Sequence, residues 1–299
     1  MIHMKNIEKT FNSQPALRNV DLNISHGSIY GLIGSNGAGK TTVIKLMAGI
    51  YKPDNGEATY DGKEIYGNTT LKDRIFYIPD QPFFLPQYTT KQMARFYRSI
   101  YSRWNEERFQ KLEEVFEINI NKKIHTFSKG VQRQVAFWLG LSTMPELLIL
   151  DEPMDGLDPV VRKKVKNLLV QDVAEREMTI VVSSHNLREI EDFCDHIGIL
   201  HQGQLLLEKD IDDLKSDVHK IQLAYKDGMP EELIGKMNVL HTEKRGSILL
   251  LIVRGNEEEI VRKIRKTNPV IFDWLSLTLE EIFIYEMGDI GYAIKNVIV

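Results

Sequence analysis

One short segment combines glycines, a lysine and a threonine at a spacing that suits the binding of phosphate groups. It follows the pattern G-x-x-x-x-G-K-[ST] and consists of Gly34, Ser35, Asn36, Gly37, Ala38, Gly39, Lys40 and Thr41, with Thr42 next to it. Glycines let successive backbone N–H groups point at phosphates, and a following helix adds partial positive charge. Lys40 is expected to reach the β- and γ-phosphates, and the Thr41 hydroxyl to ligate Mg²⁺. The alternative is a turn that only joins a strand to a helix.

Two adjacent carboxylates, Asp151 and Glu152, follow the apolar run at residues 147–150. A strand that ends there would bring both side chains to the edge of a sheet where ligands bind. Asp151 could then hold Mg²⁺ through its water shell, and Glu152 could orient or deprotonate a water aimed at the γ-phosphate. Alone, the same pair could be the solvated start of a helix. It indicates a catalytic site only because the phosphate-binding segment lies upstream.

Apolar periodicity indicates the elements that position these residues. Residues 28–33 and 42–48 predict a strand and a helix on either side of the phosphate-binding segment. Residues 147–150 and 179–182 are continuous apolar runs typical of buried parallel strands, and residues 159–176 between them predict a helix. The right-handed crossover rule puts both strands in one sheet.

Other segments predict a strand-rich part and a helical insert. Alternating residues near 2–4 and 20–24, and a run at 57–60 entered through a turn, predict half-buried antiparallel strands. Thr89 and Gln92 have the spacing of a capping box, and helical periodicity follows it. We expect a helical insert at about residues 88–128.

Three further segments complete a set of motifs that has a known order. Residues 127–134 read Phe-Ser-Lys-Gly-Val-Gln-Arg-Gln, residues 151–153 read Asp-Glu-Pro, and residues 156–159 read Gly-Leu-Asp-Pro. With the phosphate-binding segment, they make residues 1–214 resemble an ATP-binding cassette (ABC) ATPase. The resemblance is greatest to stand-alone ATP-binding subunits of bacterial transporters of drug, antimicrobial-peptide or cell-envelope type.

The resemblance implies roles for three more side chains around ATP. Phe11 would stack on the adenine ring, although a core phenylalanine is the alternative. Gln81 would touch Mg²⁺ and the attacking water, and its alternative is an ordinary turn glutamine. His185 would donate to the γ-phosphate, while the alternative is a structural histidine with satisfied hydrogen bonds.

The resemblance also implies a dimer that encloses ATP between two chains. Ser128 and Gly130 would contact the γ-phosphate held by the other subunit, and Asp158 would lie at the same interface. Asp158 followed by Pro159 also has the pattern of a helix N-cap. Lys129 stands where the family most often has glycine, which puts the rate and symmetry of hydrolysis in doubt.

An aromatic cluster follows Gln81 and consists of Phe83, Phe84, Leu85 and Tyr88. In transporters of this family, that surface receives a short helix from the membrane subunit, and aromatic side chains often anchor such contacts. The alternative is that these residues are ordinary core aromatics.

Beyond residue 214 the pattern changes. Residues 220–225, 247–253 and 270–277 predict strands, and residues 256–266 predict a helix, so we expect an α+β accessory domain at 215–299. The expected fold is therefore an α/β P-loop core of ABC type with an antiparallel β-subdomain, a helical insert and this second domain.

Composition bounds the partners and the compartment. The chain has 299 residues, 42% of them apolar, a formal net charge of −4 and no long basic run, so nucleic acid is not an expected partner. A single cysteine, Cys194, indicates a reducing compartment. The longest apolar run, at 248–253, is too short to span a bilayer, so we expect peripheral attachment at the cytoplasmic face of a membrane.

These observations predict an ATP-binding and ATP-hydrolysing subunit that powers export through separate transmembrane permease subunits. One alternative is a soluble or regulatory ABC-type ATPase that takes no part in transport. Another is an ABC-type ATPase of DNA repair or translation. The sequence lacks both the long coiled-coil insertion of repair proteins and the second cassette of translation proteins.

Overall fold

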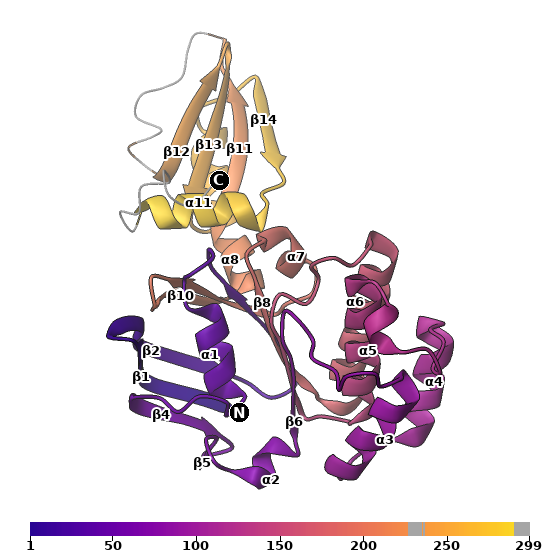
Figure 1. The fold of residues 1–299 in the computed structure, drawn as a ribbon. Coiled ribbons are helices and arrows are strands. Elements are labelled where there is room, and N and C mark those ends of the chain that lie inside the picture. Colours follow the sequence, from indigo (N-terminus) through magenta and orange to yellow (C-terminus); the bar gives the residue numbers. More distant parts are fainter. Residues whose placement is uncertain (227–234, 236, 290–299) are drawn as a thin grey trace. The chain divides into compact units, whose positions relative to one another are not determined.

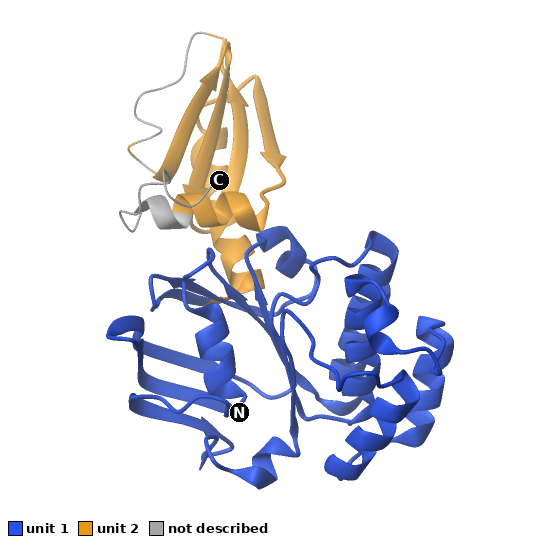
Figure 2. Ribbon diagram, in the orientation of Figure 1, with its two compact units in different colours: residues 1–208 blue, residues 209–299 orange. Residues whose placement is uncertain are grey.

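The structure is a computed structural model that describes residues 1–226, 235 and 237–289. The chain divides into two compact units, unit 1 (Met1–Glu208) and unit 2 (Lys209–Val299) (Figure 2). The division falls before residue 214, where the sequence suggested a boundary, because α8 (Ile211–Asp217) packs with elements of unit 2. Parts of the expected accessory domain, at 227–234, 236 and 290–299, lie outside the described residues.

Unit 1 is built on a six-stranded central sheet (Figure 1). In sheet order, its strands are β10 (Gln204–Asp210), β9 (His196–His201), β3 (Ile29–Ile33), β8 (Thr179–Ser184), β7 (Leu147–Leu150) and β6 (Ile75–Ile78). β7 pairs in parallel with β8, and β3 pairs in parallel with both β8 and β9. The prediction that residues 147–150 and 179–182 share one parallel sheet is therefore confirmed.

A second sheet in unit 1 contains the N-terminal strands. In sheet order, it consists of β2 (Gln14–Ile24), β1 (Ile2–Phe11), β4 (Asn55–Tyr60) and β5 (Lys63–Glu64). The paired strands run antiparallel, as predicted. α1 (Lys40–Met47) shares one hydrophobic core with both sheets, since Leu22, Leu32 and Ile44 belong to the same buried cluster.

Helices gather on the other side of the central sheet (Figure 1). They are α3 (Thr90–Ile100), α4 (Glu106–Phe116), α5 (Lys129–Ser142) and α6 (Pro159–Arg176), with the short helices α2 (Thr69–Lys72), η1 (Ile124–Thr126) and α7 (Leu187–Glu191) elsewhere in unit 1. The capping box is confirmed, because Thr89 and Gln92 exchange side-chain and backbone hydrogen bonds at the start of α3. Phe109 stacks on the fully buried Trp138 with ring centroids 4.8 Å apart, which joins α4 to α5.

Unit 2 is an antiparallel four-stranded sheet with helices. In sheet order, its strands are β12 (Asn238–Arg245), β13 (Ile248–Arg254), β11 (Val218–Ala224) and β14 (Ile271–Leu275). α10 (Glu257–Arg265) buries Ile260 and Ile264 against this sheet. The three predicted strands and the helix are present, whereas β12 and α11 (Leu279–Asp289) were not predicted.

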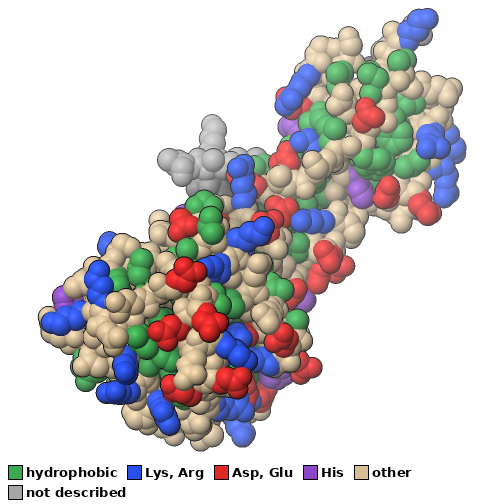
Figure 3. Space-filling model, turned by 90° about the vertical axis from the view of Figure 1, so that its right-hand side faces the viewer, with side chains coloured by type: hydrophobic (Ala, Val, Ile, Leu, Met, Phe, Trp, Pro, Cys, Tyr) green, Lys and Arg blue, Asp and Glu red, His purple; other side chains and the backbone are tan. Residues whose placement is uncertain are grey.

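The described surface matches the modest net charge of the sequence. On the face of unit 1 drawn in Figure 3, acidic and basic side chains are interspersed. Within the described part of the chain, no helix combines the length and the apolar character needed to cross a bilayer.

Candidate functional site

The phosphate-binding segment joins the buried strand β3 to α1. Gly39 caps α1 with a left-handed φ of 108°, and a Cβ atom there would lie 2.9 Å from the Ala16 carbonyl oxygen. A Cβ on Gly34 would lie 2.3 Å from the Leu200 carbonyl oxygen. Both positions therefore require glycine, because any larger residue would push the loop away from its neighbours.

Lys40 occupies the start of α1, with only 6% of the residue exposed. Its Nζ atom donates to the Gly34 carbonyl oxygen at 2.5 Å and lies 3.2 Å from Oε1 of Glu152. Helix α1 and the end of β7 thus meet through a nearly buried ion pair. Such a cation, held beside backbone N–H groups, is suited to binding an anionic ligand.

Asp151 is the centre of a hydrogen-bond network at the end of β7. It is 3% exposed, and its Oδ1 atom accepts from Ser183 Oγ at 2.7 Å and from Thr41 Oγ1 at 3.3 Å. Tyr77 donates to the other carboxylate oxygen at 3.5 Å. Burial and the nearby Asp151 charge raise the pKa of the Tyr77 phenol far above its usual range, so it remains a donor.

Glu152 is held in an uncommon backbone conformation with φ of 46°. Its backbone N–H donates to Ser183 Oγ at 2.9 Å, and its Oε2 atom lies 3.0 Å from Nδ1 of His185. Non-glycine residues in this region are strained and persist only where neighbours fix them. The strain directs the Glu152 carboxylate between Lys40 and His185, so the ends of β7 and β8 meet the start of α1.

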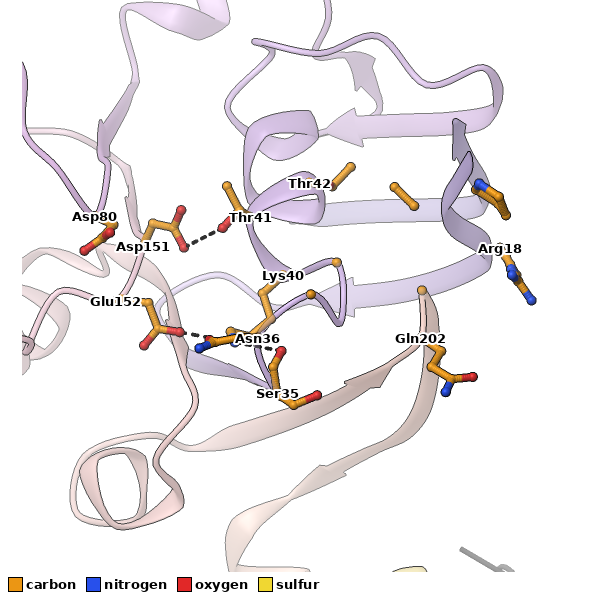
Figure 4. Close-up of a pocket in the computed structure, with 15 residues that line it drawn as sticks. Arg18, Ser35, Asn36, Lys40, Thr41, Thr42, Asp80, Asp151, Glu152 and Gln202 are labelled. Atoms are coloured by element: carbon orange, nitrogen blue, oxygen red, sulfur yellow. Dashed lines mark hydrogen bonds and ion pairs between the residues drawn. The ribbon is translucent and has the colours of Figure 1, made fainter. Parts of the chain in front are cut away.

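These side chains surround a cavity of about 500 Å³ (Figure 4). The predicted residues that line it are Ser35, Asn36, Gly37, Gly39, Lys40, Thr41, Thr42, Asp151 and Glu152. Residues that line it without having been predicted are Pro15, Ala16, Arg18, Asp80, Gln202 and Gly203. The cavity therefore combines the phosphate-binding segment with the ends of several strands.

The unpredicted lining comes from long-range packing. Arg18 N–H donates to the Gly203 carbonyl oxygen at 2.7 Å, and Gly203 N–H donates to the Ala38 carbonyl oxygen at 2.9 Å. These bonds hold β2 and the turn after β9 against the phosphate-binding segment. No local motif marks Arg18 or Gln202, and only the sheet order brings them here.

Eight predicted residues are not part of this lining, and five of them were expected around the chain's own nucleotide. Gly34 and Ala38 support the loop from behind through backbone contacts. Phe11 is 38% exposed at the end of β1 and makes an edge contact with Tyr51 at 5.2 Å between ring centroids. Gln81 is exposed, and its neighbour Asp80 lines the cavity instead. His185 is also exposed and is linked to the cavity through Glu152.

Ser128, Gly130 and Asp158 form a separate group outside the cavity lining. Ser128 caps α5, and Asp158 caps α6 by accepting from the N–H groups of Val160 and Val161, so the predicted N-cap is confirmed. Gly130 packs so closely that a Cβ there would lie 2.6 Å from the Gly156 carbonyl oxygen. Ser128 and Asp158 are exposed.

The aromatic cluster after Gln81 borders a second cavity of about 340 Å³. Its lining consists of residues 82–87 together with His125 and Gln132. Phe83 is 76% exposed, which contradicts the core alternative for this residue, whereas Phe84 and Leu85 are half-buried. An exposed phenylalanine beside an apolar hollow is typical of a contact surface.

Comparisons with known proteins agree on one protein family. Residues 17–155 match the family described as ABC transporter. The ABC transporter ATP-binding protein YtrB of Bacillus subtilis (strain 168) is 35% identical over 96% of this chain and 98% of its own length. The bacitracin transport ATP-binding protein BcrA of Bacillus licheniformis is 34% identical over 72% of this chain and 71% of its own length.

A solved structure agrees with these sequence matches. It is an ATP-binding cassette in a dimeric, post-hydrolysis state bound to ADP and Pi, and it is 25% identical to this chain. The similarity covers 71% of this chain and 99% of the other, with a TM-score of 0.65.

Proposed function

This chain belongs to the family of ABC transporter ATP-binding proteins, and from that premise we propose how its residues hydrolyse ATP and what the hydrolysis drives. The chain is an ATPase subunit with the α/β P-loop fold of this family. The observation that carries the proposal is the convergence of Lys40, Thr41, Asp151 and Glu152 on one cavity. We place the ATP phosphates there.

Lys40 acts first, as the phosphate-binding cation. In the structure its partner is Glu152, at 3.2 Å, and the β- and γ-phosphates of ATP would replace that carboxylate. ATP binding then has two effects. Lys40 neutralises charge on the phosphates, and Glu152 is released from its ion pair with Lys40. The freed carboxylate is available to accept a proton from the attacking water.

Thr41 and Asp151 suit a magnesium ion. Their hydroxyl and carboxylate oxygens lie 3.3 Å apart, and hard oxygen donors of this kind are those that Mg²⁺ prefers. When bound, Mg²⁺ would neutralise charge on the phosphate oxygens. Ser183 and Tyr77 keep the Asp151 carboxylate fixed through their hydrogen bonds.

Three further residues are proposed to complete the site. His185, within 3.0 Å of the Glu152 carboxylate, would orient that base and donate to the γ-phosphate. Gln81, beside the lining residue Asp80, would reach Mg²⁺ and the attacking water. Phe11, which is 38% exposed, would stack on the adenine.

We also propose that the working form is a dimer with ATP between two subunits. Ser128, Gly130 and Asp158 do not line their own cavity, and they would contact the nucleotide of a second ATP-binding subunit. The dimeric form of the similar solved cassette supports this assignment. Lys129 is exposed at the start of α5, where it would face the same nucleotide.

The partners and direction follow from the relatives and from the second cavity. BcrA is named for bacitracin transport, so we propose export of an antimicrobial or envelope compound by separate transmembrane permease subunits. The surface at residues 82–87 would contact those subunits at the cytoplasmic face of the membrane. We treat residues 1–214 as the ATP-binding domain and 215–299 as an accessory domain.

Phosphate release by the purified chain tests the enzymatic part of this proposal. We expect hydrolysis with ATP and Mg²⁺ and its loss when EDTA removes the metal. Reconstitution in vesicles with co-purified permease subunits tests transport, since an exporter moves substrate only when ATP is supplied. Hydrolysis that proceeds equally with EDTA would contradict the magnesium assignment, and a subunit that binds no membrane protein would favour the regulatory alternative.

A further inference from the structure

Arg133 is a buried charge in the motif at residues 127–134, and no role has been assigned to it so far. It lies in α5 after Lys129 and Gly130, and only 7% of the residue is exposed. Burying a guanidinium is costly unless its N–H groups are hydrogen-bonded. The N–H groups of Arg133 must therefore be hydrogen-bonded, and their acceptors identify the segments that Arg133 holds in place.

The guanidinium donates to two separate loops, one that contains Asp80 and one at residues 151–158 between β7 and α6. Nη1 donates to the carbonyl oxygen of Glu152 at 2.7 Å and to the carbonyl oxygen of Asp155. Nη2 donates to the carbonyl oxygen of Asp80 and to its Oδ1 atom at 2.9 Å. Three of the four acceptors are backbone oxygens, so Arg133 fixes main-chain positions rather than a single side chain.

Charge pairing alone does not account for this arrangement. The Asp80 side chain is 52% exposed, and an ion pair with such a group contributes little. The planar fork of arginine, however, presents several N–H groups in fixed directions, which a lysine ammonium cannot reproduce. The geometry is suited to holding two irregular segments at a fixed distance from each other.

Both loops belong to the site described above. The Glu152 carbonyl is part of the residue whose left-handed φ of 46° directs its carboxylate into the cavity. Asp80 lines the same cavity and precedes Gln81. Asp155 is next to Gly156, whose carbonyl oxygen packs against Gly130.

We propose that Arg133 is a positioning residue for ATP hydrolysis, acting by clamping the loop of Asp80 and the loop of Glu152 and Asp155 in one arrangement. The inference rests on the proposed function, in which Glu152 accepts the proton from water. Arg133 does not line the cavity, so its loss should impair the chemical step while ATP still binds. A misplacement of about 1 Å in a catalytic group is enough to slow a reaction about a hundredfold.

The test compares Arg133→Lys and Arg133→Met with a control, Arg108→Lys. Arg108 is also mostly buried, and its Nη2 atom lies 2.6 Å from Asp172, but its hydrogen bonds reach neither of the two loops. For each protein we would measure kcat and KM for ATP, the Kd of a fluorescent ATP analogue, and the melting temperature. Amide hydrogen exchange would be followed at residues 78–82 and 151–158.

We expect Arg133→Lys to lower kcat at least about tenfold while Kd for ATP changes less than about threefold. Exchange should rise in both segments together, and neither change should occur in Arg108→Lys. An unchanged kcat, or a loss of kcat matched by Arg108→Lys at equal melting temperature, would overturn the proposal. If Arg133→Met does not fold, Arg133→Lys still gives both readouts.

Failure of the proposed function would look different. An unmodified chain that releases no phosphate would contradict the ATPase mechanism, and hydrogen exchange would still report on the clamp. Unchanged exchange at 78–82 and 151–158 in Arg133→Lys would overturn the inference about Arg133 while leaving the ATPase mechanism intact.

Discussion

Unit 1 and unit 2 differ in what they bury. Every buried polar or charged side chain among the described residues belongs to unit 1, including Lys40, Arg133 and Asp151. The buried core of unit 2 is aliphatic and contains residues such as Leu251 and Ile260. Buried polar groups cost free energy unless they are fully hydrogen-bonded.

The difference indicates that the buried polar groups for chemistry lie in unit 1, whereas the core of unit 2 contributes packing. In unit 1, some of the buried polar residues meet at the cavity, since Lys40 and Asp151 line it and Ser183 donates to Asp151. In unit 2, the described core residues offer no such group, and their contribution is hydrophobic burial. We infer that substitutions in unit 1 mainly change activity, whereas substitutions in the core of unit 2 mainly change stability.

The largest effect should follow Glu152→Gln, which removes the proposed base but keeps the shape of the side chain. General-base catalysis contributes about 10²- to 10⁴-fold, so phosphate release should fall by about that factor. ATP should still bind, and the dimer with enclosed nucleotide should accumulate. Phosphate-release assays and size-exclusion chromatography with ATP and Mg²⁺ measure the two effects.

Glu175→Gln is the matched control, because Glu175 is an exposed glutamate on α6. It should hydrolyse ATP at the unmodified rate. Glu152→Gln protein that retains full activity would remove Glu152 from the mechanism and weaken the distinction between the two units.

Leu251→Ala should have the next largest effect, on stability alone. Leu251 is fully buried in the core of unit 2, and truncation of such a leucine costs about 2–5 kcal/mol. The midpoint of urea unfolding should therefore shift, while the Kd for ATP stays the same. A matching loss of ATP affinity would mean that unit 2 contributes to nucleotide binding, and the comparison would fail.

Lys40→Ala, in unit 1, should weaken ATP binding rather than reduce stability. A charge-assisted contact to phosphate contributes about 1.5–3 kcal/mol, so ATP affinity should fall about tenfold or more. Titration with a fluorescent ATP analogue measures it, and Lys45→Ala on the same helix is the control. Equal ATP affinity in the Lys40→Ala protein and the unmodified chain would exclude Lys40 as the phosphate-binding cation.

Phe83→Ser tests the surface of unit 1 beyond the cavity. Loss of an aromatic anchor typically costs about 2 kcal/mol, or about thirtyfold in affinity for a membrane partner. Melting temperature and ATP binding should not change, because Phe83 is 76% exposed. Co-purification with membranes is the measurement, with Phe96→Ser, also exposed, as the control. Retained association in Phe83→Ser, Phe84→Ser and Tyr88→Ser would exclude this surface as the contact.

The sequence was most informative where a function depends on one continuous segment. The phosphate-binding segment, the strand before Asp151 and the helix after Asp158 each follow from local spacing, and the structure contains all three elements. The fold class was predictable for the same reason, since alternating strands and helices require a parallel sheet. The order of the motifs along the chain then indicated the ABC ATPase family.

Residues that act through long-range packing were not predictable in this way. Arg133 contacts Asp80, 53 positions away in the sequence, and Arg18 reaches the cavity only through its bond to Gly203. β6 was missed although it has four residues like the predicted strand β7, and β12 was missed because it is mostly exposed and lacks a regular apolar pattern. Tertiary contacts, rather than local propensity, determine these features.

The smallest expected effect concerns an ion pair in unit 2 and its dependence on pH. Burial raises the pKa of Glu281, whereas hydrogen bonds from Lys220, at 2.6 Å, and from Thr278 lower it. The lowering is the larger effect, so the pKa lies below its usual 4.5. A carboxyl group whose pKa is lowered on folding stabilises the folded state above its unfolded pKa. That contribution is lost as pH falls through the lowered value.

We therefore expect the unmodified chain to be more stable than Glu281→Gln at neutral pH, with the difference shrinking as pH falls below about 4.5. Lys220→Met should reduce the same pH dependence, because it removes the hydrogen bond that lowers the pKa of Glu281. Urea unfolding between pH 7 and pH 3 measures both, and a difference that is constant across this range would contradict the assignment. Phosphate release at neutral pH should be unaffected, because Glu281 lies outside the cavity lining and the buried polar network of unit 1.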